Sequence, residues 1–150
     1  MGRGRLALLW AALALLACRN EALKLEDLNT RPVRLPNGVE IRAEVMMHPE
    51  DMIRGMMYRD SLPPDRGMLF IHGEPGQYTY WMYQVKIPLD IIWLDAQKRI
   101  VEMSPQTPPC TSRASECPHY GGNVKALYVL ELAAGSIEKH GLRLGSQLEF

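Results

Sequence analysis

The sequence predicts a mainly β domain, either an antiparallel β-sandwich or an open barrel, with one or two short helices. Roughly seven to nine short segments of apolar or alternating residues are separated by turn residues, which is typical of antiparallel β proteins. Long helices do not alternate with these segments, as they would in a doubly wound α/β fold. The 150 residues leave room for one such domain.

The N-terminal residues are set aside because they have the three parts of a secretory signal. Arg3 and Arg5 form a basic start, an apolar run covers residues 6–17, and the small residue Ala17 precedes Cys18. A run of 12 residues is too short to cross a bilayer as a helix, which needs about 20. We therefore predict export rather than a membrane-spanning anchor.

Residues 15–18, Leu-Leu-Ala-Cys, resemble a bacterial lipobox, in which the cysteine is lipidated and becomes the new N-terminus. The resemblance implies a signal peptide at 1–17. Residues 18–30, which lack a sustained apolar period, predict a tether, and the alternating pattern that follows predicts one domain at 31–150. Arg19 rather than aspartate follows Cys18, which favours the outer over the inner membrane. We expect a lipoprotein on the periplasmic side, held to the membrane through the lipid at Cys18.

The charge of the chain argues against a nucleic-acid partner. Removal of residues 1–17 takes away two arginines and leaves 15 basic and 17 acidic residues of interspersed sign. A chain so close to neutral has no basic surface for nucleic acid.

We expect a monomer.

The first half of the domain opens with a hairpin. Residues 33–35 and 39–45 alternate around Asn37-Gly38, a strong hairpin signal in which both turn residues are expected to take positive φ. Pro49 to Gly55 predicts a short helix, with proline first, acids in the first turn and a glycine at the end.

The remaining strands are short and mostly apolar. A turn at 95–99 joins two of them, a loop covers 105–124, and Gly141 ends a helical turn at 136–140. The expected strands cover residues 68–71, 78–82, 89–94, 100–103, 126–132 and 146–150.

The two cysteines of the domain predict a disulfide. Cys110 and Cys117 lie in a loop rich in proline and serine, and an even pair in an exported protein is typically bridged. The alternative is a metal site that also uses His119. The spacing of these three residues matches no familiar zinc arrangement, and a second ligand pair is missing.

Several short motifs occur in an order and spacing that resemble the family called domain of unknown function 192, over about residues 33–150. In this sequence they are Pro36-Asn37-Gly38, Arg54-Gly55-Met56-Met57-Tyr58-Arg59 with Leu62, Gly67-Met68-Leu69-Phe70, Trp81-Met82, Pro88-Leu89-Asp90, Leu130-Glu131 with Gly135, and Gly145. The resemblance implies a compact β fold, often exported, with no established activity. The family typically has Lys-Asn-Thr after Trp-Met, where this chain has Tyr83-Gln84-Val85.

The candidate binding site consists of Arg54, Arg59, Trp81, Tyr83, Asp90 and Glu131. Asp90 begins an apolar strand, where a carboxylate is costly unless paired, and we expect Arg54 or Arg59 as its partner. A structural salt bridge would explain these charges. The alternative is a site for a small anion or a sugar, with Trp81 and Tyr83 as an aromatic platform.

Three functions remain open. The first is a small ligand-binding or interaction module of the cell envelope. The second is an envelope hydrolase that uses Asp90 and Glu131, although no known nucleophile motif is present. The third is a copper-handling protein that uses methionine and histidine side chains. Adaptable core packing is a simpler role for the methionines, and no cofactor or resident metal is expected.

Overall fold

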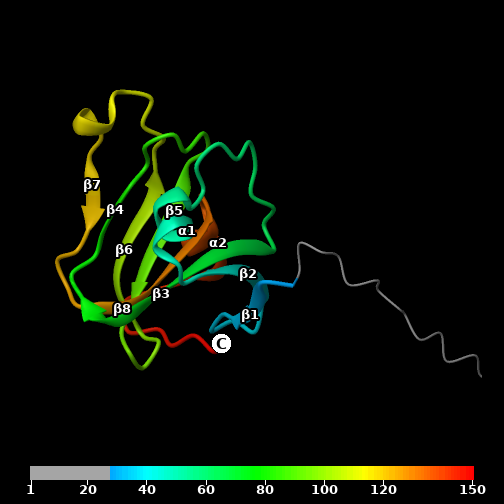
Figure 1. Ribbon diagram of the computed structural model, residues 1–150. Helices are drawn as coiled ribbons and strands as arrows, with labels where there is room; N and C mark the ends of the chain where they lie inside the picture. The colour runs from blue at the N-terminus through cyan, green and yellow to red at the C-terminus, as the bar shows by residue number, and fades with distance from the viewer. Residues whose placement is uncertain (1–27) are drawn as a thin grey trace, which may run out of the picture.

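A computed structural model describes residues 28–150, so the predicted signal peptide, Cys18 and most of the tether lie outside the described residues (Figure 1). The strands are β1 (Thr30–Arg34), β2 (Glu40–Met46), β3 (Arg66–Gly76), β4 (Thr79–Trp81), β5 (Leu89–Leu94), β6 (Ile100–Thr107), β7 (His119–Gly121) and β8 (Ala126–Ala133). The helices are α1 (Pro49–Arg54), the 3-10 helix η2 (Ala114–Glu116) and α2 (Ser136–His140). Within residues 28–150, no helix is long and apolar enough to span a bilayer.

The mainly β prediction is confirmed, with one pair of strands in an unexpected direction. Six strands form one sheet in the order β1-β2-β3-β8-β5-β6, and β4 and β7 form a second, small sheet. Every pair is antiparallel except β2 and β3, which run parallel. Parallel neighbours need a crossover connection, and residues 47–65, which include α1, supply it.

The first hairpin is confirmed, but its turn differs from the prediction. Leu35 and Val39 close a three-residue loop through a hydrogen bond from Leu35 N–H to the Val39 carbonyl, at 2.8 Å. Only Gly38 takes positive φ, at 83°, whereas Asn37 does not. Asn37 Oδ1 instead accepts the Val39 N–H at 3.2 Å. A three-residue loop needs one left-handed residue where a two-residue type I′ turn needs two.

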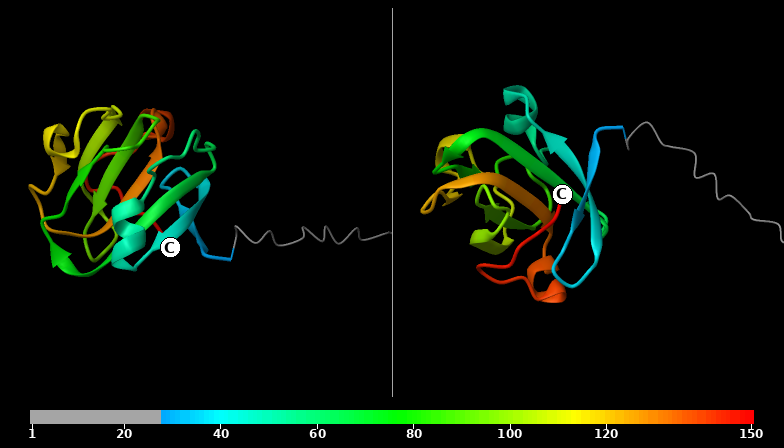
Figure 2. Two further views of the ribbon diagram at one scale, coloured as in Figure 1. Left: turned by 45° about the horizontal axis from the view of Figure 1, so that its top comes forward. Right: turned by 90° about the horizontal axis from the view of Figure 1, so that it is seen from below.

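The main sheet has an apolar core on each face. Alternation along β3, β5 and β8 sends Leu69, Ile92 and Leu130 to one core, which is closed by Leu142 and Leu148 from the C-terminal segment. The other core lies under residues that follow α1 and β4, and it holds buried Met46, Met56, Met68 and Met82. α1 and α2 lie on opposite sides of the sheet (Figure 2). Methionine suits such an irregular space beneath loops.

The later elements agree with the sequence in part, since β6 runs to Thr107 and both η2 and β7 lie inside the expected loop at 105–124. β5 and α2 have their predicted bounds, and Gly141 ends α2 in the left-handed conformation, with φ of 62°. The expected strand at 146–150 is absent from the described structure. Its residues form only the single bridges Arg34↔Glu149 and Arg99↔Gln147, because the segment crosses from one edge of the sheet to the β5–β6 turn.

The predicted disulfide is confirmed. Cys110 and Cys117 are bonded, with Cα atoms 5.8 Å apart, and the bridge closes the loop that contains η2. The loop leads into β7, and Tyr83 forms a β-bridge with Cys110. The disulfide therefore restrains the segment that carries His119 toward β4.

Loss of this bridge is expected to destabilise the protein by about 2–3 kcal/mol, because the unfolded chain regains the entropy of an open loop. The Cys110→Ala/Cys117→Ala variant should show this loss in urea unfolding. Wild-type protein treated with reductant should behave like the variant. Equal stability of all three samples, or two free thiols in protein isolated from the envelope, would contradict the prediction.

Candidate functional site

An open cleft, here called the outer cleft, lies where α1 faces β3, β4 and β7, and its volume is about 460 Å³. None of the described side chains around it belongs to aspartate, glutamate, lysine or arginine. They are Met52, Ile53, His72, Gln77, Tyr78, Thr79, Tyr80, Trp81 and His119. Its lining is thus mainly apolar and aromatic with a few hydrogen-bonding groups, as in small-molecule sites.

Ring pairs build the walls of the outer cleft. Antiparallel pairing of β4 with β7 places Trp81 opposite His119, and their rings stack with centroids 5.8 Å apart. His72 stacks on Tyr78 at 3.5 Å, and its Nε2 lies 3.2 Å from the Tyr80 hydroxyl. Burial lowers the pKa of His72 to about 4, so that its imidazole is neutral at pH 7. Burial also raises the pKa of Tyr80 above its ordinary value.

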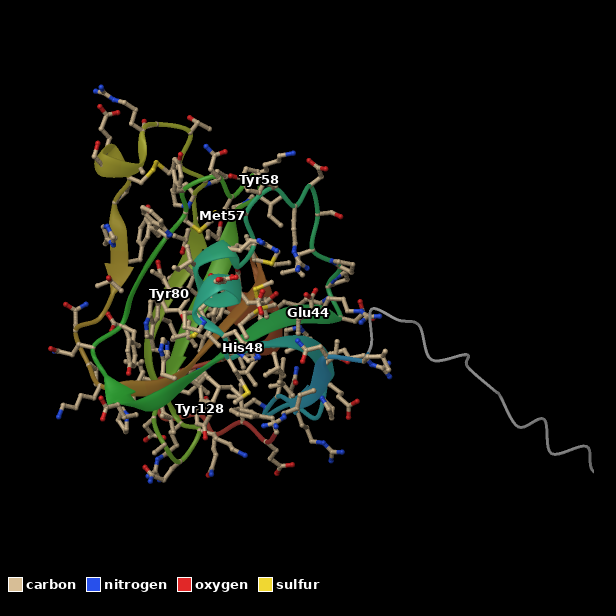
Figure 3. The ribbon with its side chains drawn as sticks, in the orientation of Figure 1. Glu44, His48, Met57, Tyr58, Tyr80 and Tyr128 are labelled. Atoms are coloured by element: carbon tan, nitrogen blue, oxygen red, sulfur yellow. A yellow bond between two sulfur atoms is a disulfide. The ribbon has the colours of Figure 1, made fainter. Side chains whose placement is uncertain are left out.

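A second hollow, here called the inner cavity, adjoins the outer cleft and has a volume of about 30 Å³. Met52, Ile53, Tyr80 and Trp81 border both, so the two spaces are neighbours. The other residues of its lining include Arg54, Phe70, Tyr83, Val85 and Glu131. Tyr80, which is labelled in Figure 3, borders both spaces.

Glu131 is the unusual group of the inner cavity. It lies in the middle of β8, between Met68 of β3 and Ile91 of β5, and is 4% exposed. Its Oε2 is buried and has no hydrogen-bond partner among the described residues. Burial raises the pKa of this carboxyl to about 8, against an opposing effect of Arg59. Glu131 is therefore mostly protonated at neutral pH, and such perturbed groups cluster at functional sites.

The two arginines of the predicted site have different surroundings. Arg59 donates to both carboxylate oxygens of Glu44, at 2.5 and 2.7 Å, and this hydrogen bonding raises the pKa of Arg59. Arg54 is exposed, borders the inner cavity and has no ion pair with any residue of 28–150. Sequence reasoning missed Glu44, which belongs to a strand with ordinary alternation (Figure 3).

The expected pairing of Asp90 with Arg54 or Arg59 is wrong. Asp90 is fully buried, and its two oxygens accept the backbone N–H groups of Gln106 and Ile137, each at 2.7 Å. The first donor lies near an irregularity in the β5–β6 ladder and the second lies in the first turn of α2. Backbone N–H groups can satisfy the hydrogen bonds of a buried carboxylate, just as an arginine side chain can.

Asp90 and Glu131 also face opposite sides of the sheet. In the β5–β8 pair, Asp90 lies opposite Leu132, whereas Glu131 lies opposite Ile91. Opposed residues share a face and successive residues alternate. The structure thus gathers Arg54, Trp81, Tyr83 and Glu131 around the inner cavity, keeps Arg59 near Glu131, and excludes Asp90.

Two left-handed residues lie next to the site. Tyr58 and Gln84 have φ of 66° and 57°, and the Tyr58 N–H donates to the Gln84 carbonyl at 2.9 Å. Asparagine, which the family resemblance places at position 84, adopts this conformation readily. A turn requirement therefore accounts for that position without a ligand contact. Tyr80 and His72 are further site residues that the sequence did not single out, since scattered rings and histidines carry no local signal. The sequence points to His119 only as a metal ligand beside the cysteines.

The fold and the cleft define a small, mainly β domain with a mixed six-stranded sheet and an aromatic hollow beside its short first helix. The chain belongs to the domain of unknown function 192 family (DUF192), whose model is described as "Uncharacterized ACR" and matches residues 33–150. The expected family membership is thus confirmed. A search of curated proteins found no significant match.

Two solved structures are similar to this chain. One is a protein of unknown function from Novosphingobium aromaticivorans, with a TM-score of 0.73, 26% identity, and coverage of 81% of this chain and 85% of that one. The other is a protein described as a putative transcription regulator from Sinorhizobium meliloti. Its TM-score is 0.70, its identity 29%, and its coverage 79% of this chain and 89% of that one.

Proposed function

We propose that this protein is an exported lipoprotein of the cell envelope that binds a small ligand in the outer cleft. The observation that carries the proposal is the unpartnered Oε2 of Glu131 at the inner end of an aromatic hollow. A buried polar atom without a partner is costly. A ligand group that reaches the inner cavity would supply the missing hydrogen bond.

The two alternative functions have less support. A hydrolase would need Asp90 and Glu131 in one pocket, and they lie on opposite faces of the sheet. For copper, no group of three His, Cys, Asp or Glu side chains in residues 28–150 is placed to hold a metal ion. Met46, Met56, Met68 and Met82 are packed in the core and are at most 9% exposed, whereas Met52 borders the outer cleft together with His72 and His119.

A fluorescent apolar probe tests whether the outer cleft takes ligands. N-phenyl-1-naphthylamine is neutral and aromatic, and its emission should rise when it enters the outer cleft of the full chain. Trp81→Ala removes part of the wall and should weaken probe binding about tenfold. Leu144→Ala, at a 64% exposed residue that does not border the cleft, should leave it unchanged. Equal binding by all three proteins would contradict the proposal.

The location has its own test, at Cys18. The lipobox-like residues 15–18 lead us to expect a diacylated or triacylated N-terminal cysteine in protein extracted from membranes. Mass spectrometry of the N-terminal peptide detects this modification. Cys18→Ser should abolish processing and leave residues 1–17 attached. An unmodified Cys18 in a soluble mature protein would contradict the proposed anchoring.

A further inference from the structure

We propose that the ligand is a neutral saccharide whose ring lies against Trp81 in the outer cleft, while one of its hydroxyl groups enters the inner cavity and hydrogen-bonds with Glu131. This inference rests on the proposed function and names the class of its ligand. It also decides between the two ligands that the sequence left open, a small anion and a sugar.

The charge of the site favours a neutral ligand. The part of the chain that the structure describes places no charged side chain in the outer cleft, and His72 is neutral there at pH 7. An ion would lose its hydration without a counter-charge. Among the described residues, an anion at the inner cavity would find a counter-charge only in the exposed Arg54, because Arg59 already holds Glu44 with two hydrogen bonds.

The aromatic lining suits the face of a sugar ring. Trp81 is partly exposed, stacks on His119, and has the ring centroid of Tyr83 5.3 Å away. The negative face of an indole attracts the C–H groups of a pyranose. The indole N–H of Trp81 has no partner within residues 28–150, whereas that of Trp93 donates to the Tyr78 carbonyl. It remains available to a sugar hydroxyl.

The inner cavity has room for one hydroxyl group. Its volume of about 30 Å³ exceeds the roughly 10–15 Å³ that one water-sized group needs. A hydroxyl both donates and accepts, and so does a protonated carboxyl, so the two groups match. A bulkier substituent does not fit unless Met56, Phe70 or Val85 moves.

Val85 contributes an apolar side chain to the lining of the cavity that holds Glu131. Its side chain is 6% exposed and borders the same cavity as Glu131. A threonine at this position would bring a hydrogen-bonding group into the cavity from within the protein. Valine has the same shape without that group. In this chain, we expect the ligand to supply the hydroxyl.

Calorimetric titration of the full chain tests the inference with cellotriose, maltotriose and N,N′,N″-triacetylchitotriose, and with trigalacturonate as the anionic probe. We expect at least one neutral trisaccharide to bind and trigalacturonate to bind at least tenfold more weakly. Val85→Thr should weaken the binding of the neutral sugar at least fivefold, because the threonine hydroxyl occupies the place of the sugar hydroxyl. Val39→Thr, on the distant β1–β2 turn, makes the same chemical change and should have no effect.

The role of Glu131 is tested in the same titration. Glu131→Leu should weaken sugar binding about tenfold, whereas Glu131→Gln, which still donates and accepts, should stay within threefold of wild type. Failure of every neutral trisaccharide, or unchanged binding in Val85→Thr and Glu131→Leu, would overturn the saccharide assignment. If N-phenyl-1-naphthylamine still bound, only the ligand class would be wrong. If that probe failed as well, the proposed function itself would fall.

Discussion

Asp90→Ala is expected to lower the free energy of unfolding by about 3–5 kcal/mol. The variant removes the acceptor for the N–H groups of Gln106 and Ile137 and leaves both donors without their partner in a dry region. It also frees α2 from β5, since Ile137 lies in the first turn of that helix. Urea unfolding followed by circular dichroism measures the loss.

Two other variants calibrate this result. Asp90→Asn keeps one acceptor oxygen but turns its amide toward the second N–H group, and should therefore cost about half as much. Asp60→Ala removes an exposed carboxylate whose partner is Lys86, and should change stability by less than about 1 kcal/mol. An Asp90→Ala variant as stable as Asp60→Ala would show that Asp90 does not hold these elements together.

Glu131→Gln should stabilise the protein, and its advantage should grow as the pH rises. Wild-type Glu131 titrates near pH 8 when folded and near 4.5 when unfolded. Between these values only the folded state holds the proton, so wild-type stability falls by up to about 1.4 kcal/mol per pH unit. Glutamine does not titrate. The variant should therefore gain on the order of 3–5 kcal/mol over wild type above pH 8.

Denaturant titrations of both proteins from pH 5 to 9 measure this difference. Glu149→Gln supplies the matched control, because Glu149 is exposed and its substitution should give a curve parallel to wild type. Parallel stability curves for Glu131→Gln and wild type would mean that burial does not raise the pKa of the Glu131 carboxyl in the folded protein.

Local signals in the sequence predicted much of the fold. β5 is a short apolar run between a proline and a turn, α2 ends at Gly141, and the two cysteines share one loop. The parallel β2–β3 pair was not predictable in this way, because alternation marks a strand but not its direction. The Asn37-Gly38 pair predicted where the turn lies but not how many residues its loop contains.

The candidate site, like the fold, was only partly predictable from the sequence. The family motifs and the chemistry of buried charge singled out Trp81 and Glu131, which the structure brings to one cavity. The sequence predicts the same place for Asp90, because a carboxylate at the start of an apolar strand is expected to pair with an arginine. Only the register of β5 against β8 shows that they face opposite sides. The partners of Asp90 are backbone amides, which no side-chain pattern reveals.

Carbon-13 NMR of the Glu131 side-chain carboxyl tests the central claim most directly, in the free protein and with a saturating neutral trisaccharide. In the free protein, the resonance should titrate with a midpoint near pH 8, because the group is buried and unpartnered. The bound sugar should shift the resonance, because its hydroxyl becomes the hydrogen-bond partner of the carboxyl. A midpoint near pH 4.5, together with a resonance that the sugar leaves unmoved, would contradict the account.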